Sequence, residues 1–476
     1  MSNYRYIDLF SGAGGISIGF GNHDFHLELA NDIFSDALNT LKYNLKHAHP
    51  ETDPSRVILG DIKELYNYLN VNEVEITNES HLTLQTNKDA RVNKQTASIK
   101  ENKQIEEIVS SIRDIDVLVG GPPCQGFSLI GRAKKATKEE RMKGFIDDPR
   151  NQLFKYFLKF ADKLAPKIVL IENVKGLASA SKYRDLIEET LRNTGVGYDV
   201  SSTIINAKYF GIPQNRERIF FIGLRRDISN NHDISAVDIF NNIIENNKSE
   251  DILTLNDAIK DLPEVIANPL KSNYEVKNEI PIGKIDSFGQ NISSEEYSLL
   301  IDDNNKSKYT NIINTYKGKD IKTKYLFNHK ARYNNERDLF IYKNLAHGKY
   351  LDHPDNEMAL SKVPYGIYYD EQGKRCIRNF TDKYFKLDPN KPSKTIIAHL
   401  EVDGNSYVHP GDKPRSITPR EAARIQSFPD WYFFTGTTRK QLKQIGNAVP
   451  PLLASYFAQE FKRILLTIDE NNNDTK

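Results

Sequence analysis

The sequence has little of what marks several large classes of protein. It holds only two cysteines among 476 residues, Cys124 and Cys376, which argues against a disulfide framework and favours a reducing, cytosolic setting. These cysteines and the 11 histidines show no spacing typical of metal ligands, so we expect no metal. No apolar run approaches the length that spans a membrane, and residues 1–10 lack the pattern of a signal peptide.

An excess of one charge is also absent. Lysine and arginine number 65 against 64 aspartates and glutamates, which gives a formal net charge of +1. The strongly basic composition of many nucleic-acid-binding chains is therefore missing, and any such surface must arise from local clustering. With 38% hydrophobic residues, the chain is long enough to fold into two domains.

The first half of the chain alternates short apolar runs with segments of helix length. Seven runs are expected to be strands: residues 4–10, 26–32, 56–60, 115–120, 168–173, 198–206 and 218–223. Runs rich in Val, Ile and Leu are typical of parallel strands buried on both faces. The pattern predicts an α/β domain over residues 1–225 with a doubly wound, mostly parallel, seven-stranded sheet. Polar side chains at the strand ends should then lie over one ligand-binding crevice.

Two regions interrupt this rhythm. Residues from about 66 to 107 are rich in Asn, Glu, Thr and Lys and are expected to form a surface insertion. Residues 226–418 are polar and irregular and predict a second, smaller domain. Order returns near Lys391. Thr418, Pro419 and Glu421 make a good helix start at the beginning of residues 419–476, and apolar spacing after Pro451 predicts an amphipathic helix. This last part is expected to be a hinge and a helix that returns to the first domain.

A glycine-rich turn follows the first predicted strand. Its residues Phe10, Gly12, Gly14 and Gly15 would let the backbone approach a nucleotide-like ligand closely, although a plain tight turn explains the segment equally well. The third spaced glycine of a dinucleotide site is missing, so a nicotinamide cofactor is disfavoured. Asp32 and Asp61 end the next two strands. Each alone is better explained as a helix cap, but candidate ligands at three successive strand ends favour a binding crevice.

The segment Pro122-Pro123-Cys124-Gln125 presents a cysteine directly after a strand and a rigid Pro-Pro pair. Structural cysteines usually lie inside apolar stretches, whereas this one lies at the ligand-binding edge, which favours a nucleophile. Basic residues outnumber acidic ones over the following residues 132–143, beginning with Arg132. They fit a loop that closes over phosphates, and a solvated basic loop is the plain alternative.

Taken in order, these motifs resemble those of the cytosine-C5 DNA methyltransferase family, in its bacterial, restriction-modification form. The resemblance extends over roughly residues 4–223 and 392–466. The motifs that carry it are the turn at 10–15, Pro122-Pro123-Cys124-Gln125, residues 148–154, Glu172-Asn173-Val174, Gln214-Asn215-Arg216-Glu217-Arg218, residues 420–424 with 428–430, and residues 446–450. It implies a class I, Rossmann-like methyltransferase fold that uses S-adenosyl-L-methionine (AdoMet), with a smaller irregular recognition domain.

The resemblance also implies roles in the reaction. Cys124 would add to C6 of cytosine and so make C5 nucleophilic, and Glu172 would donate a proton or hydrogen bond at N3. Arg218 would hold the base oxygen O2, while Arg216 would brace the loop and contact phosphate. The plain alternatives are that Glu172 is a helix-capping carboxylate and that Arg216 and Arg218 are surface charges. No side chain stands out as the base that removes the C5 proton, and water could serve.

Cofactor and DNA contacts follow from the same resemblance. The cofactor, released as S-adenosyl-L-homocysteine, would be bound by Phe10, Gly12, Gly14, Gly15, Asp32, Asp61, Pro122, Leu153, Asn447 and Ala448. Asp32 departs slightly from the family, in which many members carry Glu. The target base must be flipped out of the duplex. DNA contacts are expected from Gln125, Ser128, Arg132 and Gln214, and base recognition in the major groove from residues 226–418.

Three other functions were weighed against DNA methylation. A tRNA cytosine methyltransferase would share the chemistry, but such enzymes carry a Cys-Phe-Thr signature that this sequence lacks. A catalytically silent DNA-binding relative is disfavoured by the intact Cys124, Glu172 and Arg218, and a cysteine hydrolase by the lack of a histidine motif. We therefore expect a monomeric, cytoplasmic bacterial enzyme that acts on double-stranded DNA at the nucleoid, paired with a restriction endonuclease.

Overall fold

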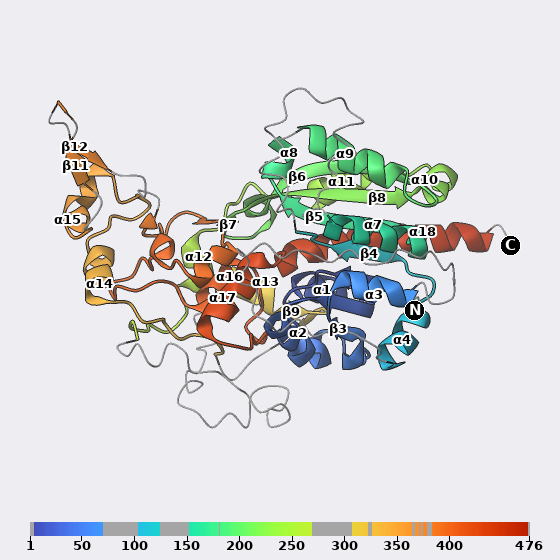
Figure 1. Ribbon diagram of the computed structural model, residues 1–476, viewed down its shortest axis with the longest axis horizontal. Helices are drawn as coiled ribbons and strands as arrows, with labels where there is room; N and C mark the ends of the chain where they lie inside the picture. Colours follow the sequence, from blue (N-terminus) through green and yellow to red (C-terminus); the bar gives the residue numbers. More distant parts are fainter. Residues whose placement is uncertain are drawn as a thin grey trace, which may run out of the picture.

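The computed structural model describes residues 4–69, 103–123, 152–179, 181–268, 307–321, 326–363, 367–369, 371–372, 375–377 and 383–474. A sheet covered by helices occupies one side of the molecule, and the short elements α14, α15, β11 and β12 lie at the opposite end (Figure 1). Elements from the hinge and from both halves of the chain fill the space between them. Both chain termini lie on the side of the sheet.

The central sheet has seven strands in the order β3-β2-β1-β4-β5-β8-β6. They are β1 (Arg5–Leu9), β2 (His26–Asp32), β3 (Val57–Leu59), β4 (Val117–Gly120), β5 (Ile168–Val174), β6 (Tyr198–Asn206) and β8 (Glu217–Arg225). All seven predicted strands and the mostly parallel sheet are confirmed. Only β8 runs antiparallel to its neighbours β5 and β6. The chain enters β8 from β6 through the short η3 (Ala207–Phe210) and β7 (Gln214–Asn215), which are too few residues for a parallel crossover.

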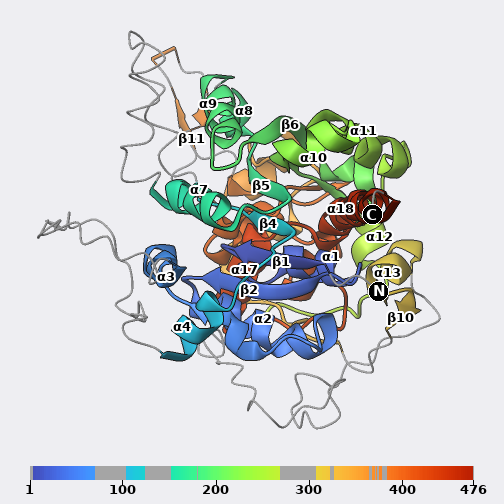
Figure 2. The same cartoon turned by 90° about the vertical axis from the view of Figure 1, so that its right-hand side faces the viewer.

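Helices cover both faces of this sheet (Figure 2). One layer contains α1 (Gly15–Gly21), α2 (Ser35–Ala48), α10 (Arg226–His232), α11 (Ala236–Asn247) and α18 (Pro451–Asp474). Their buried side chains, among them Phe20, Leu41, Phe240 and Phe457, share one apolar core with the sheet. The sheet's helical layer therefore continues to Asn247, past the domain boundary expected at residue 225.

The opposite layer contains α3 (Ile62–Leu69), α4 (Lys103–Ser110), α7 (Gln152–Leu164) and α9 (Ser181–Arg192), with the short α8 (Gly176–Ser179) before α9. Leu65, Val109 and Phe157 pack against the sheet in a second core. Helices α3 and α4 lie at the two ends of the expected insertion and contact each other. Residues 70–102 between them lie outside the described residues.

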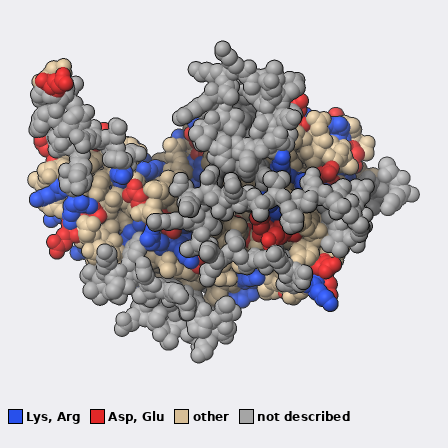
Figure 3. Space-filling model, viewed as in Figure 1, with Lys and Arg blue, Asp and Glu red and all other residues tan. Residues whose placement is uncertain are grey.

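The region expected to be a second domain consists of short elements. They are α12 (Leu255–Ile259), α13 (Lys308–Asn314), β9 (Thr315–Tyr316), β10 (Lys319–Asp320), α14 (Glu336–Lys343), η7 (Pro354–Asn356), α15 (Glu357–Leu360), β11 (Ile367–Tyr369), β12 (Arg375–Ile377), β13 (Ser393–Lys394), η9 (Ala398–Glu401) and η10 (Asn405–Tyr407). Part of this region shares a core with the glycine turn and the hinge, where Leu255, Tyr309 and Tyr407 are buried with Ala13. A small separate core around Ile341 and Tyr342 supports the far end. Lysine and arginine side chains gather over this half of the surface (Figure 3).

The hinge contains α16 (Pro419–Ile425) and α17 (Thr438–Asn447) and continues into α18. Helix α16 begins with the predicted capping box, in which Thr418 and Glu421 bond each other's backbone amides. Helix α18 lies so close to α1 that a Cβ at Gly19 would stand 2.5 Å from the nitrogen of Ser455. Within the described part of the chain, no helix has the length and apolarity to cross a membrane.

Candidate active site at the carboxyl ends of the strands

The predicted site residues that follow parallel strands gather at one edge of the sheet. Strands β3, β2, β1, β4 and β5 are neighbours in that order. Because their carboxyl ends meet at the same edge, this edge holds Asp61, Asp32, the turn after Leu9, Pro122 and Glu172. The sheet order therefore turns five separate positions of the sequence into one continuous rim.

The glycine turn after β1 has an unusual backbone. Phe10, Gly12 and Gly14 have φ values of 60°, 54° and 80°, in the left-handed region that favours glycine. A Cβ built at Gly12 would meet no atom within 4 Å, so the turn faces open space there. A Cβ at Gly15 would instead lie 2.2 Å from the carbonyl oxygen of Val449. The turn is thus open to a ligand on one side and packed against the end of the chain on the other.

Asp32 ties this turn to the start of α2. Its carboxylate accepts hydrogen bonds from the amide of Gly12 at 2.9 Å and from that of Phe34 at 2.8 Å. Burial raises the pKa of Asp32, while the two backbone donors act in the opposite direction. Ile33 and Phe34 remain exposed beside it and offer an apolar surface that a flat ring could cover. Together with the space over Gly12, these features fit a nucleoside-like cofactor.

Asp61 occupies a simpler position at the start of α3. Its Oδ1 atom accepts a hydrogen bond from the amide of Lys63 at 2.9 Å, and its carbonyl accepts one from Leu65. This is the helix-capping role that the sequence left open. Among the described residues, His, Cys, Asp and Glu form no group of three or more that could hold a metal ion.

Glu172 and Arg218 form an ion pair at the rim. The distance from Nε of Arg218 to Oε1 of Glu172 is 3.1 Å, and the two side chains are 14% and 13% exposed. They lie on adjacent strands, where Val174 of β5 pairs with Arg218 of β8. A Cβ at Gly121 would lie 3.5 Å from Oε2 of Glu172, so the glycine leaves room beside the carboxylate. The pair presents a carboxyl group and a guanidinium to the same small space.

Asn173 anchors the backbone that leads to Cys124. Its Nδ2 donates to the carbonyl oxygen of Pro122 at 3.0 Å, and its Oδ1 accepts from the amide of Val174 at 2.9 Å. The sequence analysis named Asn173 only as a position of the Glu172-Asn173-Val174 motif and did not predict this contact. Four predicted residues, Cys124, Gln125, Ser128 and Arg132, lie outside the described residues.

Arg216 is buried rather than presented to solvent. It is 2% exposed, and its guanidinium donates to the carbonyl oxygens of Ile396 at 2.8 Å and Ala448 at 3.0 Å. Burial, followed by the charge of Arg218, lowers the pKa of Arg216 to about 9. The side chain therefore braces two segments from the last quarter of the chain. Its burial does not fit the phosphate contact that we also expected.

Gln214 requires a correction. We expected it to contact DNA, but its side chain is fully buried and bonded to the protein backbone. Its Oε1 accepts from the amide of Ile396 at 2.8 Å, and its Nε2 donates to the carbonyl oxygen of Ile425 at 3.1 Å. The parallel pairing of β7 with β13, in which Gln214 lies opposite Ser393, brings Ile396 close, while Ile425 comes from the end of α16. Gln214 thus joins the catalytic half to the hinge.

The far end of the chain returns to the glycine turn. Ala448 follows α17, and its Cβ would lie 3.3 Å from a Cβ built at Gly15. Asn447 beside it is exposed. Leu153, in the first turn of α7, is partly buried in the same core as Phe10. Phe10, Gly15 and Ala448 therefore lie near one another at the glycine turn.

Tyr432 is a contact that sequence reasoning missed. Its hydroxyl donates a hydrogen bond of 2.5 Å to the carbonyl oxygen of Ala13, in the middle of the glycine turn. A Cβ at Gly14 would lie 2.9 Å from this hydroxyl, so only glycine leaves room for it. The aromatic run at residues 431–434 beside Phe428-Pro429-Asp430 signals a buried segment, but it does not reveal the partner.

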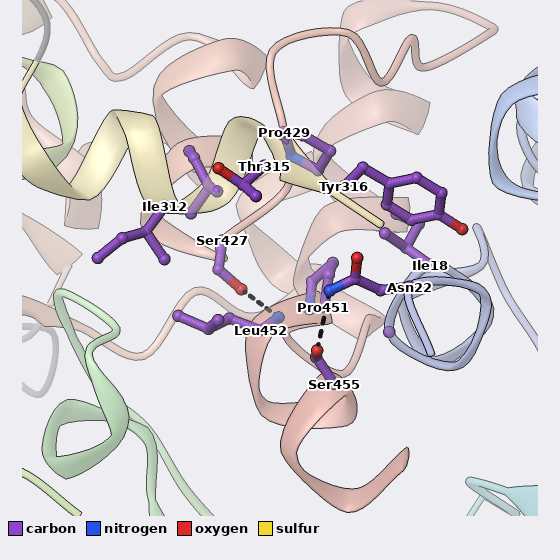
Figure 4. A pocket seen from close by; sticks show the side chains of 12 residues that line it. Ile18, Asn22, Ile312, Thr315, Tyr316, Ser427, Pro429, Pro451, Leu452 and Ser455 are labelled. Carbon is purple, nitrogen blue, oxygen red and sulfur yellow. Dashed lines mark hydrogen bonds between the residues drawn. The ribbon is translucent and has the colours of Figure 1, made fainter. Parts of the chain in front are cut away.

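A small cleft lies elsewhere, among α1, β9 and α18 (Figure 4). Its volume is about 40 Å³, and Asn22, Ser427 and Leu452 are among the residues that line it. Ser427 accepts a hydrogen bond from the amide of Leu452 at 3.1 Å, and Asn22 donates to Ser455 at 3.2 Å. These contacts fasten the hinge to α1 and α18. The cleft contains none of the predicted catalytic residues.

The sheet order and the rim of glycine turn, Asp32 and Glu172–Arg218 define a class I, Rossmann-like methyltransferase. Residues 4–70 and 64–463 match the model of the C-5 cytosine-specific DNA methylase family. The chain belongs to this family and is a DNA (cytosine-5-)-methyltransferase by class.

Individual relatives extend the match over most of the chain. It is 33% identical over 378 residues to the type II methyltransferase M.DdeI of Desulfomicrobium norvegicum, covering 76% of this chain and 77% of that protein. It is 27% identical over 487 residues to the type II methyltransferase M.Bpa9945I of Bacillus paralicheniformis, covering 96% and 98%. The crystal structure of a DNA modification methyltransferase from an E. coli prophage has a TM-score of 0.60 at 22% identity, covering 97% and 99%. This last likeness concerns the fold alone.

Proposed function

We propose that this enzyme methylates C5 of a flipped-out cytosine in double-stranded DNA through a covalent bond from Cys124 to C6. The observation that carries the proposal is the Glu172–Arg218 pair beside the backbone of residues 121–123, which leads directly to Cys124. Two kinds of group, an acid and a guanidinium, are what an activated cytosine requires. Both are held at the rim by strand pairing rather than by a loop.

The chemistry begins with the thiolate of Cys124. Its electron pair forms the S–C6 bond, and the electrons of the C5–C6 double bond shift so that C5 becomes nucleophilic while negative charge develops toward N3 and O2. Glu172 donates a proton or hydrogen bond at N3, and Arg218 holds O2. After methyl transfer, the C5 proton is lost to water, its bonding electrons restore the C5–C6 double bond and expel the thiolate, and a proton donated at N3 returns to Glu172. Asn173 steadies the backbone of Pro122 throughout, two residues from the sulfur.

S-adenosyl-L-methionine supplies the methyl group when bound and leaves as S-adenosyl-L-homocysteine. The residues proposed to hold it are Phe10, Gly12, Gly14, Gly15, Asp32, Asp61, Pro122, Leu153, Asn447 and Ala448. The open space over Gly12 and the exposed Ile33 and Phe34 support this placement. Because it accepts hydrogen bonds from the backbone amides of Gly12 and Phe34, Asp32 shapes the turn, and it also offers a carboxylate to ribose hydroxyls.

DNA is the proposed substrate, and the enzyme is proposed to act as a monomer at the nucleoid, in the cytoplasm. Flipping the base costs a few kcal/mol, which contacts inside the site must offset. The lysine and arginine side chains over the half of the surface that holds the expected recognition domain, residues 226–418, offer a surface for phosphates (Figure 3). The names of the relatives, which are type II methyltransferases, support a role as the modification enzyme that protects DNA from a partner endonuclease.

The test is to express the protein in a host that lacks cytosine methylation and to sequence its bisulfite-treated DNA. We expect cytosines within one short motif to resist conversion. Cys124→Ser should abolish this resistance, whereas Cys376→Ser, which alters the chain's other cysteine, should preserve it. If no motif is protected although the folded protein binds AdoMet, the DNA assignment is wrong, and tRNA becomes the substrate to assay.

A further inference from the structure

The glycine turn needs support because its backbone is strained. Three of the five residues from Phe10 to Gly14 have positive φ values, and one of the three is not glycine. Such conformations persist only where the surroundings hold them. Two bonds tie the turn to β2, from Gly12 to Asp32 and from Ser11 to the carbonyl oxygen of Asn31 at 3.0 Å, and within the turn Gly14 donates to the carbonyl oxygen of Ser11 at 2.9 Å. The Ala13 carbonyl points the other way, toward the hinge.

The hinge meets that carbonyl with a buried hydroxyl. Tyr432 is fully buried, and its hydroxyl lies 2.5 Å from the carbonyl oxygen of Ala13. Burial raises the pKa of Tyr432 well above its usual value, so the hydroxyl stays a donor at every working pH. The two residues are 419 positions apart in the sequence. This contact therefore exists only when the hinge is folded against the catalytic half.

Tyr432 is itself held firmly. Its backbone carbonyl accepts a hydrogen bond of 2.6 Å from Arg420, which is fully buried. The same guanidinium donates to the carbonyl oxygens of Pro429 at 2.9 Å and Phe327 at 2.8 Å. The ring of Tyr432 also packs against that of Phe428, with centroids 5.2 Å apart. The hydroxyl consequently has little freedom to leave the turn.

We propose that Tyr432 is a positioning residue for the cofactor turn, which holds the Ala13 carbonyl so that the turn keeps the shape that binds AdoMet. This inference rests on the proposed function only in taking AdoMet as the ligand of the turn. Loss of the hydroxyl should leave the fold and the chemical step in place and weaken cofactor binding. The effect should appear in the affinity for AdoMet rather than in the maximal rate.

The chain offers a matched control in Tyr309. This tyrosine is also almost fully buried in the same apolar core as Tyr432. Its hydroxyl donates to the carbonyl oxygen of Arg424 at 2.6 Å, away from the glycine turn. Tyr309→Phe thus removes a hydrogen bond of the same kind, at similar burial, without touching the turn. This control shows how the loss of a buried tyrosine hydrogen bond away from the turn affects stability and AdoMet binding.

The experiment compares wild type, Tyr432→Phe and Tyr309→Phe by titration calorimetry with AdoMet and by the increase in melting temperature on adding AdoMet. Loss of one buried hydrogen bond corresponds to roughly a 5-fold change in an equilibrium constant. We expect Tyr432→Phe to raise the Kd and KM for AdoMet by about 5-fold or more, with kcat at saturation and DNA affinity within about twofold of wild type. Tyr309→Phe should lower the melting temperature similarly and leave the Kd unchanged.

The outcomes separate this inference from the proposed function. If wild type binds AdoMet and Tyr432→Phe binds it equally well, or if both variants weaken binding alike, the positioning role is refuted while the proposed function stands. If wild type itself binds no AdoMet, both fail. The increase in melting temperature on adding AdoMet can be compared even where a variant is less stable, because it is measured relative to the same variant without AdoMet.

Discussion

Replacing Glu172 by glutamine is the sharpest test of the proposed chemistry. Glutamine keeps the size of the side chain and can still donate and accept hydrogen bonds, but it cannot transfer a proton to N3 of the base. The change also removes the charge that faces Nε of Arg218 at 3.1 Å. Both side chains are about one-seventh exposed, so water can reach the arginine only in part.

The expected loss follows from the role assigned to the carboxyl group. Proton transfer by a positioned acid contributes about 10²- to 10⁴-fold to a rate. At ~1.4 kcal/mol for each factor of ten, this raises the activation barrier by roughly 3 to 5.5 kcal/mol. Cofactor binding should be almost unchanged, because none of the proposed cofactor contacts lies on β5.

The assay is transfer of a radiolabelled methyl group to DNA at saturating AdoMet, with the melting temperature measured in parallel. Glu217→Gln is the matched control, since Glu217 lies on β8 beside Arg218 but pairs with Lys175 at the surface. An exposed pair of this kind contributes about 0–1 kcal/mol to stability, and its loss should leave the rate within about twofold. If Glu172→Gln retains more than about a tenth of the wild-type kcat, Glu172 does not act as the acid that transfers a proton to N3.

Three further changes test the packing and the buried charges. Gly15→Ala should lower the free energy of unfolding by about 1–3 kcal/mol, because its Cβ would meet the Val449 carbonyl oxygen at 2.2 Å; unchanged denaturant unfolding would contradict the close packing. Burial raises the pKa of Asp8 to about 8, against an opposing hydrogen bond from Ser17, so its contribution to stability is present below pH 4 and lost as pH rises toward 8. Asp8→Asn should remove this decline. If the free energy of unfolding changes between pH 5.5 and 8.5 by the same amount in wild type and in Asp8→Asn, the reasoning is wrong. Burial alone would raise the pKa of Glu421, but the charges of Arg415 and His409 outweigh it and hold the pKa well below its usual range. Glu421→Gln should therefore cost about 3–5 kcal/mol at pH 7, measured by chemical unfolding, and progressively less as the pH falls below the ordinary pKa of a glutamate, because the unfolded wild-type chain then takes up a proton that the folded carboxylate does not.

Local patterns in the sequence carried the predictions that were confirmed. The apolar runs that became β1 to β6 and β8 depend on side chains a few residues apart, and so does the capping box of Thr418 and Glu421. The order of motifs along the chain also sufficed to recognise the family. The antiparallel direction of β8 could have been inferred from its short connection to β6, because a parallel crossover needs more residues.

The positions that sequence reasoning misplaced depend on partners from remote segments. Gln214 looked like a polar residue free to meet DNA, yet it bonds Ile396, which follows the strand β13 paired with β7, and Ile425 at the end of α16. Helices α10 and α11 follow the last strand in a polar stretch, but one face of each completes the core of the sheet. Neither outcome can be predicted from neighbours along the chain.

The sequence by itself determined which residue types stand at the strand ends and hence the class of chemistry. Only the tertiary structure decided which of them meet: Glu172 with Arg218, Arg216 with Ile396 and Ala448, and Tyr432 with Ala13. The physical reason is that a motif records local backbone geometry, such as a glycine turn or a helix cap. The partner of a buried polar group is set instead by which distant backbone donor or acceptor the folded core brings within about 3 Å.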